Sequence, residues 1–292
     1  MFFEDERVQK TGPPIVFYVG VFTFAWLTRR FIDVLGAKYF RKFKDSDLYV
    51  FLMEFIATAQ MCTCVYENGI IVKHFGWQGF GTIVAILLFA GSFFNRGAFV
   101  NPLVPIELFY YGVMTWQRTF ITLAAQCLGG WAAFRLAMNL WFWSADYSLD
   151  HALALDPNCT LRYKIGPEFV ILWELVGTFL LRTGIAMMPL KLKTLGVPVM
   201  VAGFLSFAMV WVGIPALNPL VVSSRLWGCR GVDDQWFILY YWIIPLIGWL
   251  SASKVTGPLI RPKSQPQPAI QQSKGKKKTH QFASKSGKRK TE

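Results

Sequence analysis

Long, almost uncharged runs of hydrophobic residues alternate with short polar segments along most of the chain. The runs cover residues 15–27, 48–66, 78–94, 119–143, 167–188, 197–214 and 236–252. A helix that crosses the hydrocarbon layer of a membrane needs about 20 predominantly apolar residues. The last six runs therefore predict six membrane-spanning helices, a pattern typical of an all-α, polytopic membrane protein.

The first run, residues 15–27, is shorter and is followed by Arg29 and Arg30. It can cross the membrane if the two arginines extend to the interface, or it can lie in the interface as an amphipathic helix. We predict that it crosses, as an extra N-terminal membrane helix. The stretch Met1–Arg7 has no basic residue before position 7, so it does not resemble the start of a cleaved signal peptide.

Composition supports a membrane protein and locates the charge. Of the 292 residues, 54% are hydrophobic and 16% are charged, whereas a soluble domain carries about 25% charged residues. The net charge is +13, but residues 254–292 hold eleven Lys or Arg against one acid. The basicity therefore belongs to a C-terminal tail, residues 253–292, which we predict to be disordered and cytosolic. No folded element for nucleic-acid recognition is visible.

Positive charge also predicts the orientation. A basic cluster precedes the second run: Arg29, Arg30, Lys38, Arg41, Lys42 and Lys44. Cytosolic segments are enriched in Lys and Arg, and six crossings place this cluster and the tail on the same side. Residues 143–166 and 215–235 then face the lumen, and 189–196 the cytosol. Asn158-Cys159-Thr160 fits the N-glycosylation pattern and falls in the predicted lumenal loop.

Two parts of the chain carry the same three landmarks in the same order. The first holds Glu54-Phe-Ile-Ala-Thr58, Asn101-Pro102-Leu103 and Gly130; the second holds Glu174-Leu-Val-Gly-Thr178, Asn218-Pro219-Leu220 and Gly248. Glutamate and asparagine are 47 and 44 residues apart, and asparagine and glycine are 29 and 30 apart. This register indicates an internal duplication. Each copy has three spans, and an odd number inverts the second copy relative to the first.

Each Asn-Pro pair precedes a short apolar stretch, residues 103–109 or 220–226, which is too short to cross. Proline is favoured at the first helical position, so Asn101 and Asn218 are predicted N-caps of two half-helices. Half-helices that enter from opposite faces bring their positive ends together near the membrane midplane. Non-helical backbone at that depth must be buried in protein or line an aqueous cavity. The predicted centre is a pore that repels cations and protons.

The paired Asn-Pro boxes, the two Glu-x-x-(Ala/Gly)-Thr elements and the run Tyr241-Trp-Ile-Ile-Pro-Leu-Ile-Gly248 resemble the aquaporin (major intrinsic protein) superfamily over about residues 48–252. The run Glu54–Glu67 looks most like its unorthodox, intracellular branch, the super-aquaporins. The resemblance implies a right-handed bundle of six helices with two re-entrant half-helices, and a homotetramer. It also implies that buried Glu54 and Glu174 accept backbone N–H bonds from the re-entrant loops.

The chain departs from the family pattern inside the boxes and beside them. Leu103 and Leu220 replace alanine, which should change the spacing of the half-helices. Val221 replaces the arginine of the outer selectivity filter. Counting along the chain, the other predicted filter positions are Phe80 or Gly81, Ser206 and Pro215. A filter without a guanidinium should admit small neutral solutes such as glycerol or hydrogen peroxide, or it can close by dewetting.

Other polar residues have simpler interpretations. We expect Arg225 and Arg230 to be ordinary loop residues, and Cys62 and Cys64 to be small buried residues. Cys159 and Cys229 both fall in predicted lumenal loops, and the sequence leaves open whether they are bonded. No spacing predicts a metal site, a cofactor or a catalytic group.

The chain divides into an N-terminal segment and basic linker (1–47), a first channel repeat (48–142), a lumenal loop (143–166), a second repeat (167–252) and the tail (253–292). Lys288 and Lys290 resemble a dilysine signal for retrieval to the endoplasmic reticulum, which implies contact with a vesicle coat. The basic tail can also contact membrane lipid.

The leading hypothesis is a passive channel for water or small neutral solutes in the endoplasmic reticulum or another intracellular membrane, with the plasma membrane as the alternative. The competing hypothesis is a non-conducting structural or interaction protein whose pore is closed by Leu103, Leu220 and Val221.

Overall fold

The structure is a computed structural model that describes residues 6–39, 42–155 and 159–260. Within these ranges it is helical, with one isolated bridge between Thr160 and Arg230 and no strand. The glycosylation candidate Asn158 and the retrieval candidates Lys288 and Lys290 lie outside the described residues. The elements are α1 (Glu6–Tyr39), η1 (Phe43–Asp45), α2 (Asp47–Phe94), α3 (Leu103–Tyr110), α4 (Trp116–Ser144), α5 (Leu149–Ala154), α6 (Pro167–Met187), η2 (Leu190–Leu192), α7 (Lys193–Trp211), α8 (Pro219–Leu226), α9 (Asp234–Ile238), η3 (Leu239–Ile243) and α10 (Ile244–Thr256).

The described part of the chain contains six helical segments that are long and apolar enough to cross a membrane. One of them, α2, has 48 residues and would extend about 72 Å if straight, which is twice what a crossing needs. Gly76 interrupts it with φ 60° and ψ −156°, a conformation that glycine adopts without steric cost. Residues on both sides of Gly76, such as Tyr66 and Leu87, pack in one cluster. Helix α2 is therefore a hairpin of two spans, as the runs 48–66 and 78–94 predict.

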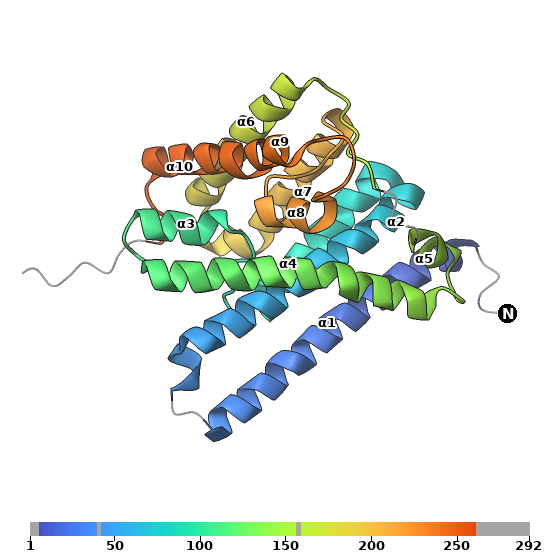
Figure 1. Ribbon diagram of the computed structural model, residues 1–292, viewed down its shortest axis with the longest axis horizontal. Coiled ribbons are helices and arrows are strands. Elements are labelled where there is room, and N and C mark those ends of the chain that lie inside the picture. The colour runs from blue at the N-terminus through green and yellow to red at the C-terminus, as the bar shows by residue number, and fades with distance from the viewer. Residues whose placement is uncertain (1–5, 40–41, 156–158, 261–292) are drawn as a thin grey trace, which may run out of the picture. The chain divides into compact units, whose positions relative to one another are not determined.

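Helix α1 is much longer than the run 15–27 and lies beside α2 (Figure 1). Its segment Gln9–Tyr39 is long and apolar enough to cross. The expectation that both arginines extend to the interface is wrong for Arg29, which is 1% exposed and donates to Gln60 Oε1 at 2.9 Å. Arg30 is exposed and lies over the Trp26 ring. The two neighbours differ because consecutive residues of an α-helix lie about 100° apart around its axis.

Glycines allow the helices of each repeat to cross closely. A Cβ on Gly129 of α4 would lie 2.6 Å from the Phe55 carbonyl oxygen of α2. A Cβ on Gly248 of α10 would overlap the Leu175 carbonyl oxygen of α6. Phe55 and Leu175 each follow the glutamate of their repeat, so Gly129, rather than the predicted Gly130, is the structural equivalent of Gly248.

The second repeat ends later than residue 252. Arg182 of α6 and Glu107 of α3 form an ion pair of 2.7 Å with both side chains fully buried. Arg182 also donates to the Gly257 carbonyl at 2.8 Å, and Glu107 accepts the Leu259 N–H at 2.9 Å. Ions buried this way need hydrogen bonds to all their groups. Residues 253–260, predicted as the start of a disordered tail, are therefore ordered against the bundle.

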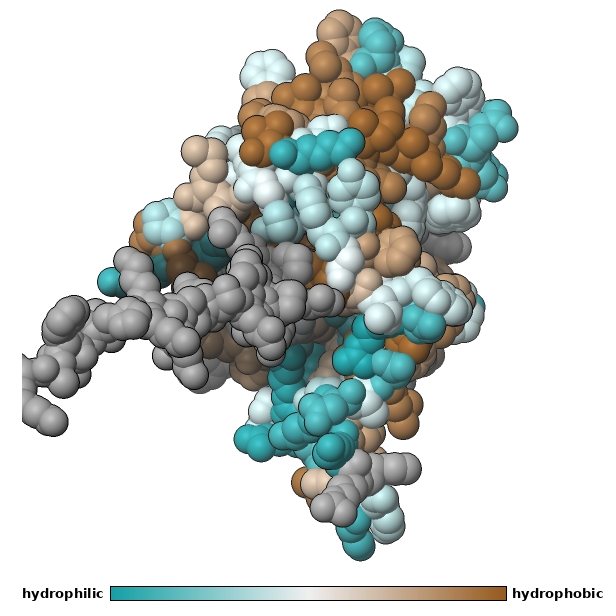
Figure 2. All heavy atoms as spheres, turned by 90° about the vertical axis from the view of Figure 1, so that its left-hand side faces the viewer, coloured by the Kyte–Doolittle hydropathy of each residue, from teal (hydrophilic) through white to brown (hydrophobic). Residues whose placement is uncertain are grey.

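The outer faces of the long helices carry large apolar side chains. Trp143 and Phe120 of α4 and Phe93 of α2 are 70%, 67% and 65% exposed. Figure 2 shows hydrophobic residues gathered in the upper part of one side of the molecule and hydrophilic residues lower down. A monomeric soluble protein rarely exposes so much apolar surface. These faces fit contact with lipid, and the protein is an all-α, multi-pass membrane protein.

Candidate pore

The two half-helices begin similarly, but Asn218 is the N-cap of α8 as predicted, whereas the N-cap of α3 is Pro102, one residue after the predicted Asn101. Helix α3 starts after Asn101-Pro102, and α8 starts after Asn218 at Pro219. Asn101 Oδ1 accepts the Leu103 N–H at 3.0 Å, and Asn218 Oδ1 accepts the Leu220 N–H at 3.1 Å. Each amide oxygen therefore satisfies a free donor of the first turn. The amide nitrogens remain for other partners.

The residue before each asparagine has an unusual backbone conformation. Val100 has φ 57° and Leu217 has φ 63°, a left-handed region that residues with branched or bulky side chains rarely adopt. Such conformations persist where the surroundings hold them, often at functional sites. The same strain in both copies turns each loop sharply into its half-helix.

Glu54 holds the first of these turns. Its Oε1 accepts the Phe99 N–H at 2.7 Å, and its Oε2 accepts the Val100 N–H at 3.2 Å and the Gln126 amide at 3.0 Å. The carboxylate is 2% exposed. Three donors therefore compensate for the removal of this group from water.

Glu174 holds the second turn with fewer contacts. Its Oε2 accepts the Leu217 N–H at 3.2 Å, whereas its Oε1 has no hydrogen-bond partner among the described residues. The side chain is fully buried. The two carboxylates occupy equivalent positions, but the duplication does not repeat the glutamine that supports Glu54.

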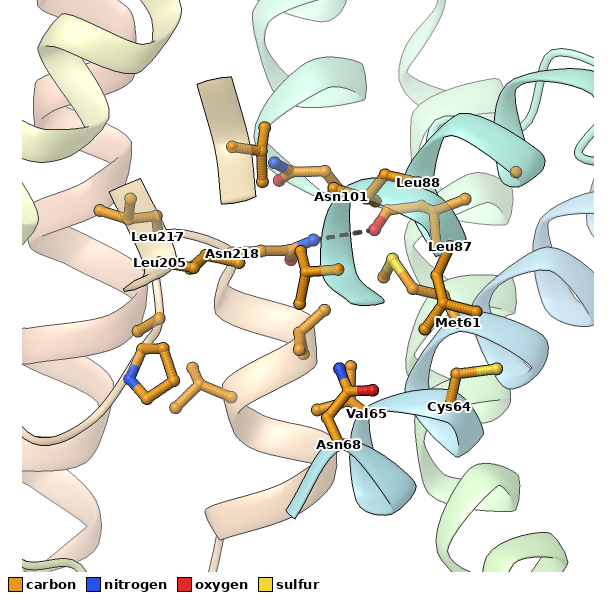
Figure 3. A pocket seen from close by; sticks show the side chains of 18 of the residues that line it. Met61, Cys64, Val65, Asn68, Leu87, Leu88, Asn101, Leu205, Leu217 and Asn218 are labelled. Atoms are coloured by element: carbon orange, nitrogen blue, oxygen red, sulfur yellow. Dashed lines mark hydrogen bonds between the residues drawn. The ribbon is translucent and has the colours of Figure 1, made fainter. Parts of the chain in front are cut away.

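One hydrogen bond joins the two loops directly. Asn218 Nδ2 donates to the Val100 carbonyl oxygen at 3.0 Å (Figure 3). The N-termini of α3 and α8 therefore meet, although the loops are more than one hundred residues apart in the chain. Each amide nitrogen has two hydrogens, so Asn218 retains one further donor.

A cavity of about 330 Å³ extends along this junction, and both asparagines line it. Its wall is mainly aliphatic and aromatic; the polar side chains in it are Gln60, Asn68, Asn95, Asn101, Asn218 and Arg225. A mainly apolar cavity with a few donors can hold neutral molecules and offers a cation little compensation for its lost hydration.

Three of the predicted filter residues line this cavity, namely Phe80, Pro215 and Val221. The prediction is wrong for Gly81 and Ser206, which line a separate groove between α2 and α7. A Cβ on Gly81 would lie 2.5 Å from Ser206 Oγ. The missing side chain of Gly81 lets α7 approach α2 with Ser206 at the contact, so Ser206 faces away from the asparagines.

The other box residues do not line the cavity. Leu103 and Leu220 are 1% and 3% exposed and are packed in the protein interior. A Cβ on Gly130 of α4 would touch the Leu220 side chain at 3.5 Å. The prolines Pro102 and Pro219 are likewise outside the lining. Leu103 and Leu220 are therefore not part of the wall of this cavity, whereas Val221, the third residue of the closed-pore hypothesis, lines it.

Arg225 was expected to be a loop residue, and the structure corrects this. It lies in the last turn of α8 and lines the cavity. Its Nη2 is 3.1 Å from the position of a Cβ built on Gly69. Arg225 follows Val221 by four residues, so both are on one face of the half-helix. That spacing is the sequence signal that would have identified it.

The loop after α8 is attached to the loop before α6. Cys159 and Cys229 form a disulfide. Beside it, the Leu161 N–H donates to the Arg230 carbonyl at 2.8 Å and the Arg230 N–H donates to the Cys159 carbonyl at 3.2 Å. Arg230 is therefore a surface residue of this junction, as expected. The junction fixes the end of the half-helix that carries Arg225.

A buried polar cluster lies in the middle part of α2, before the interruption at Gly76, and was not predicted. Glu67 accepts from the Trp141 indole at 2.7 Å and contacts His151 Nε2 at 3.1 Å. His151 Nδ1 contacts Ser144 Oγ at 2.6 Å. Although a serine, a histidine and a carboxylate lie in series, His151 is 1% exposed and neither it nor Ser144 lines a described cavity. The cluster attaches α5 to α2 and α4.

Half-helices that meet at asparagine caps inside a bundle of spans define a re-entrant membrane channel.

No protein-family model matches the chain. It is 37% identical to a putative aquaporin-10 of Caenorhabditis elegans, over 94% of this chain and 96% of that protein, and 20% identical to an aquaporin-11 of Milnesium tardigradum, over 75% and 79%. The solved structure of an aquaglyceroporin from Plasmodium falciparum matches with a TM-score of 0.56 and 17% identity, over 72% of this chain and 95% of that one. The chain belongs to the aquaporin superfamily, in its unorthodox branch. It is a channel protein for water or small solutes rather than an enzyme.

Proposed function

We propose that the chain passively conducts water and small neutral solutes, such as glycerol and hydrogen peroxide, through the cavity at Asn101 and Asn218. The observation that carries the proposal is that both asparagines line one mainly apolar cavity of about 330 Å³. Both half-helices direct their positive ends to this point, which disfavours cations. Val221 leaves the filter position aliphatic, and Arg225 supplies a guanidinium one turn further along.

The test measures permeability of the full-length protein in proteoliposomes. Stopped-flow light scattering reports water and glycerol flux, and an enclosed dye reports peroxide entry. We expect wild-type flux above that of empty vesicles and a loss of about tenfold in Asn218→Asp, since a carboxylate neither donates to Val100 nor orients a solute oxygen. Ser206→Ala, outside the cavity, is the matched control. Wild-type flux equal to that of empty vesicles would favour the structural or interaction protein instead.

We further propose that the protein resides in the endoplasmic reticulum or another intracellular membrane as a homotetramer, with Lys288 and Lys290 retrieving it through a vesicle coat. Microscopy of Lys288→Ser/Lys290→Ser tests the address, and movement to the plasma membrane is the expected result. Glycosylation at Asn158 in microsomes tests the orientation, because only a lumenal asparagine is modified. Cross-linking in native membranes tests the tetramer.

A further inference from the structure

Helix α1 lies outside both repeats, yet it contributes to the cavity wall. Phe22 lines the cavity together with residues from both halves of α2, such as Met61 and Leu87. Tyr18, Phe22, Ala25 and Arg29 follow the spacing of one helix face. On that face Tyr18, Ala25 and Arg29 are 5%, 4% and 1% exposed. Phe22 therefore covers the cavity at the seam of the α2 hairpin.

The same face holds two polar residues of the cavity. Tyr18 OH donates to Asn68 Oδ1 at 2.7 Å, and Arg29 Nη1 donates to Gln60 Oε1 at 2.9 Å. Both acceptors line the cavity. Arginine has only donors, so Gln60 must direct its oxygen toward α1. Its Nε2 has no acceptor among the described residues and is free to donate into the cavity.

Asn68, eight residues after Gln60 on α2, has the same arrangement. Its oxygen is held by Tyr18, and its Nδ2 has no acceptor among the described residues. Figure 3 shows its amide at the cavity together with those of Asn101 and Asn218. Gln60, Asn68 and the two box asparagines therefore give a series of amide donors.

Arg29 adds a charge behind this wall. Its Nε and Nη2 have no hydrogen-bond partner among the described residues, and its guanidinium forms no ion pair with them. A charged residue within a membrane span is costly and is a functional candidate for that reason. A fixed positive charge one side chain from the cavity repels permeating cations across a medium of low dielectric constant.

We propose that α1 is part of the conduction pathway: Phe22 closes the side wall of the cavity, and Tyr18 and Arg29 are positioning residues that fix Asn68 and Gln60 as donors. This inference rests on the proposed function. The solutes it favours are small molecules with oxygen acceptors, and cations are excluded. If Tyr18 and Arg29 only stabilised the fold, their loss would lower the fluxes of all solutes in parallel. If they position the donors, their loss changes the ratio of one solute's flux to another's.

The experiment compares full-length variants with control variants at exposed residues of the same type on α1. Phe22→Ala is compared with Phe24→Ala, Arg29→Met with Arg30→Met, and Tyr18→Phe with Tyr39→Phe. All three control residues are exposed; Phe24 and Tyr39 are 60% and 64% exposed. Water, glycerol and proton fluxes are measured in proteoliposomes. Elution and thermal unfolding in detergent report folding, and Tyr18→Phe removes only one oxygen.

We expect Phe22→Ala to raise the glycerol-to-water ratio, with Phe22→Leu close to wild type. Tyr18→Phe should change that ratio by about fivefold, the factor of one ordinary hydrogen bond. Arg29→Met should raise proton leak, and Arg29→Lys should restore exclusion. If the wild type conducts and the fluxes of all three variants equal those of their controls, this inference is overturned but the proposed function is not. Wild-type flux equal to that of empty vesicles overturns the proposed function and this inference together.

Discussion

Asn218 donates to the backbone carbonyl of Val100 at 3.0 Å, so the cap of the second half-helix supports the strained turn before the first. The relation is not reciprocal in the described residues, since Asn101 Nδ2 makes no matching bond to Leu217. The repeat is therefore symmetric in its caps and asymmetric in the contact that joins them. This asymmetry separates the roles of two otherwise equivalent residues.

Substitution of the two asparagines should affect stability unequally. Asn218→Asp places a carboxylate oxygen against the Val100 carbonyl, and we expect a loss of about 1–3 kcal/mol in unfolding free energy. Asn101→Asp retains an acceptor for the Leu103 N–H and should cost less. Thermal unfolding in detergent measures both. Equal losses would contradict the asymmetric contact.

The two buried glutamates should also differ. Glu54 accepts three hydrogen bonds on two oxygens, and glutamine has only one acceptor oxygen, so Glu54→Gln leaves buried donors unpaired at a cost of about 1–3 kcal/mol each. Glu174 uses one oxygen, and Glu174→Gln can keep that bond, so we expect a change below about 1 kcal/mol. Denaturation of the two variants side by side provides the measurement. A larger effect at Glu174 would contradict this account.

Arg225 should govern ion exclusion at its end of the cavity. A unit charge a few ångströms from a permeating cation costs that cation about 1–4 kcal/mol, a factor of at least about five in rate. Arg225→Met keeps the length of the side chain and removes the charge, so potassium leak in proteoliposomes should rise while water flux changes little. Arg230→Met, on the surface, is the control. Unchanged leak would show that Arg225 does not govern exclusion.

The attachment of α5 to the bundle should weaken at acid pH. Burial raises the pKa of Asp150, but the hydrogen bonds from Lys73 and His74 and their charges lower it by more, so the net pKa lies below its usual value. A lowered folded-state pKa gives stabilisation that is present above the unfolded value of about 3.9 and is lost as the pH falls through the folded value. Hydrogen-exchange protection of α5 should therefore hold from pH 7 to 5 and fall below about pH 4. Asp150→Asn should weaken it at neutral pH, and the exposed Asp146→Asn should not.

Sequence alone determined the features of this protein that depend on local or periodic properties. Hydropathy gives the spans because lipid selects uniformly apolar segments, and Asn-Pro gives the caps at Asn101 and Asn218 because capping is decided within a few residues. The duplicated register of Glu54 and Glu174 gives the inverted repeat. Helix α1 was also expected, although its length was not.

Only the tertiary structure decided which side chains face the cavity. In a membrane, apolar residues suit the lipid and the protein interior equally, so the hydrophobic pattern does not fix the rotation of a helix about its axis. Contacts between distant residues fix it: the contact of Gly81 with Ser206 holds that serine in a groove away from the asparagines. The pairing of Cys159 with Cys229 and of Arg29 with Gln60 likewise depends on helices meeting across the fold, which no spacing along the chain records.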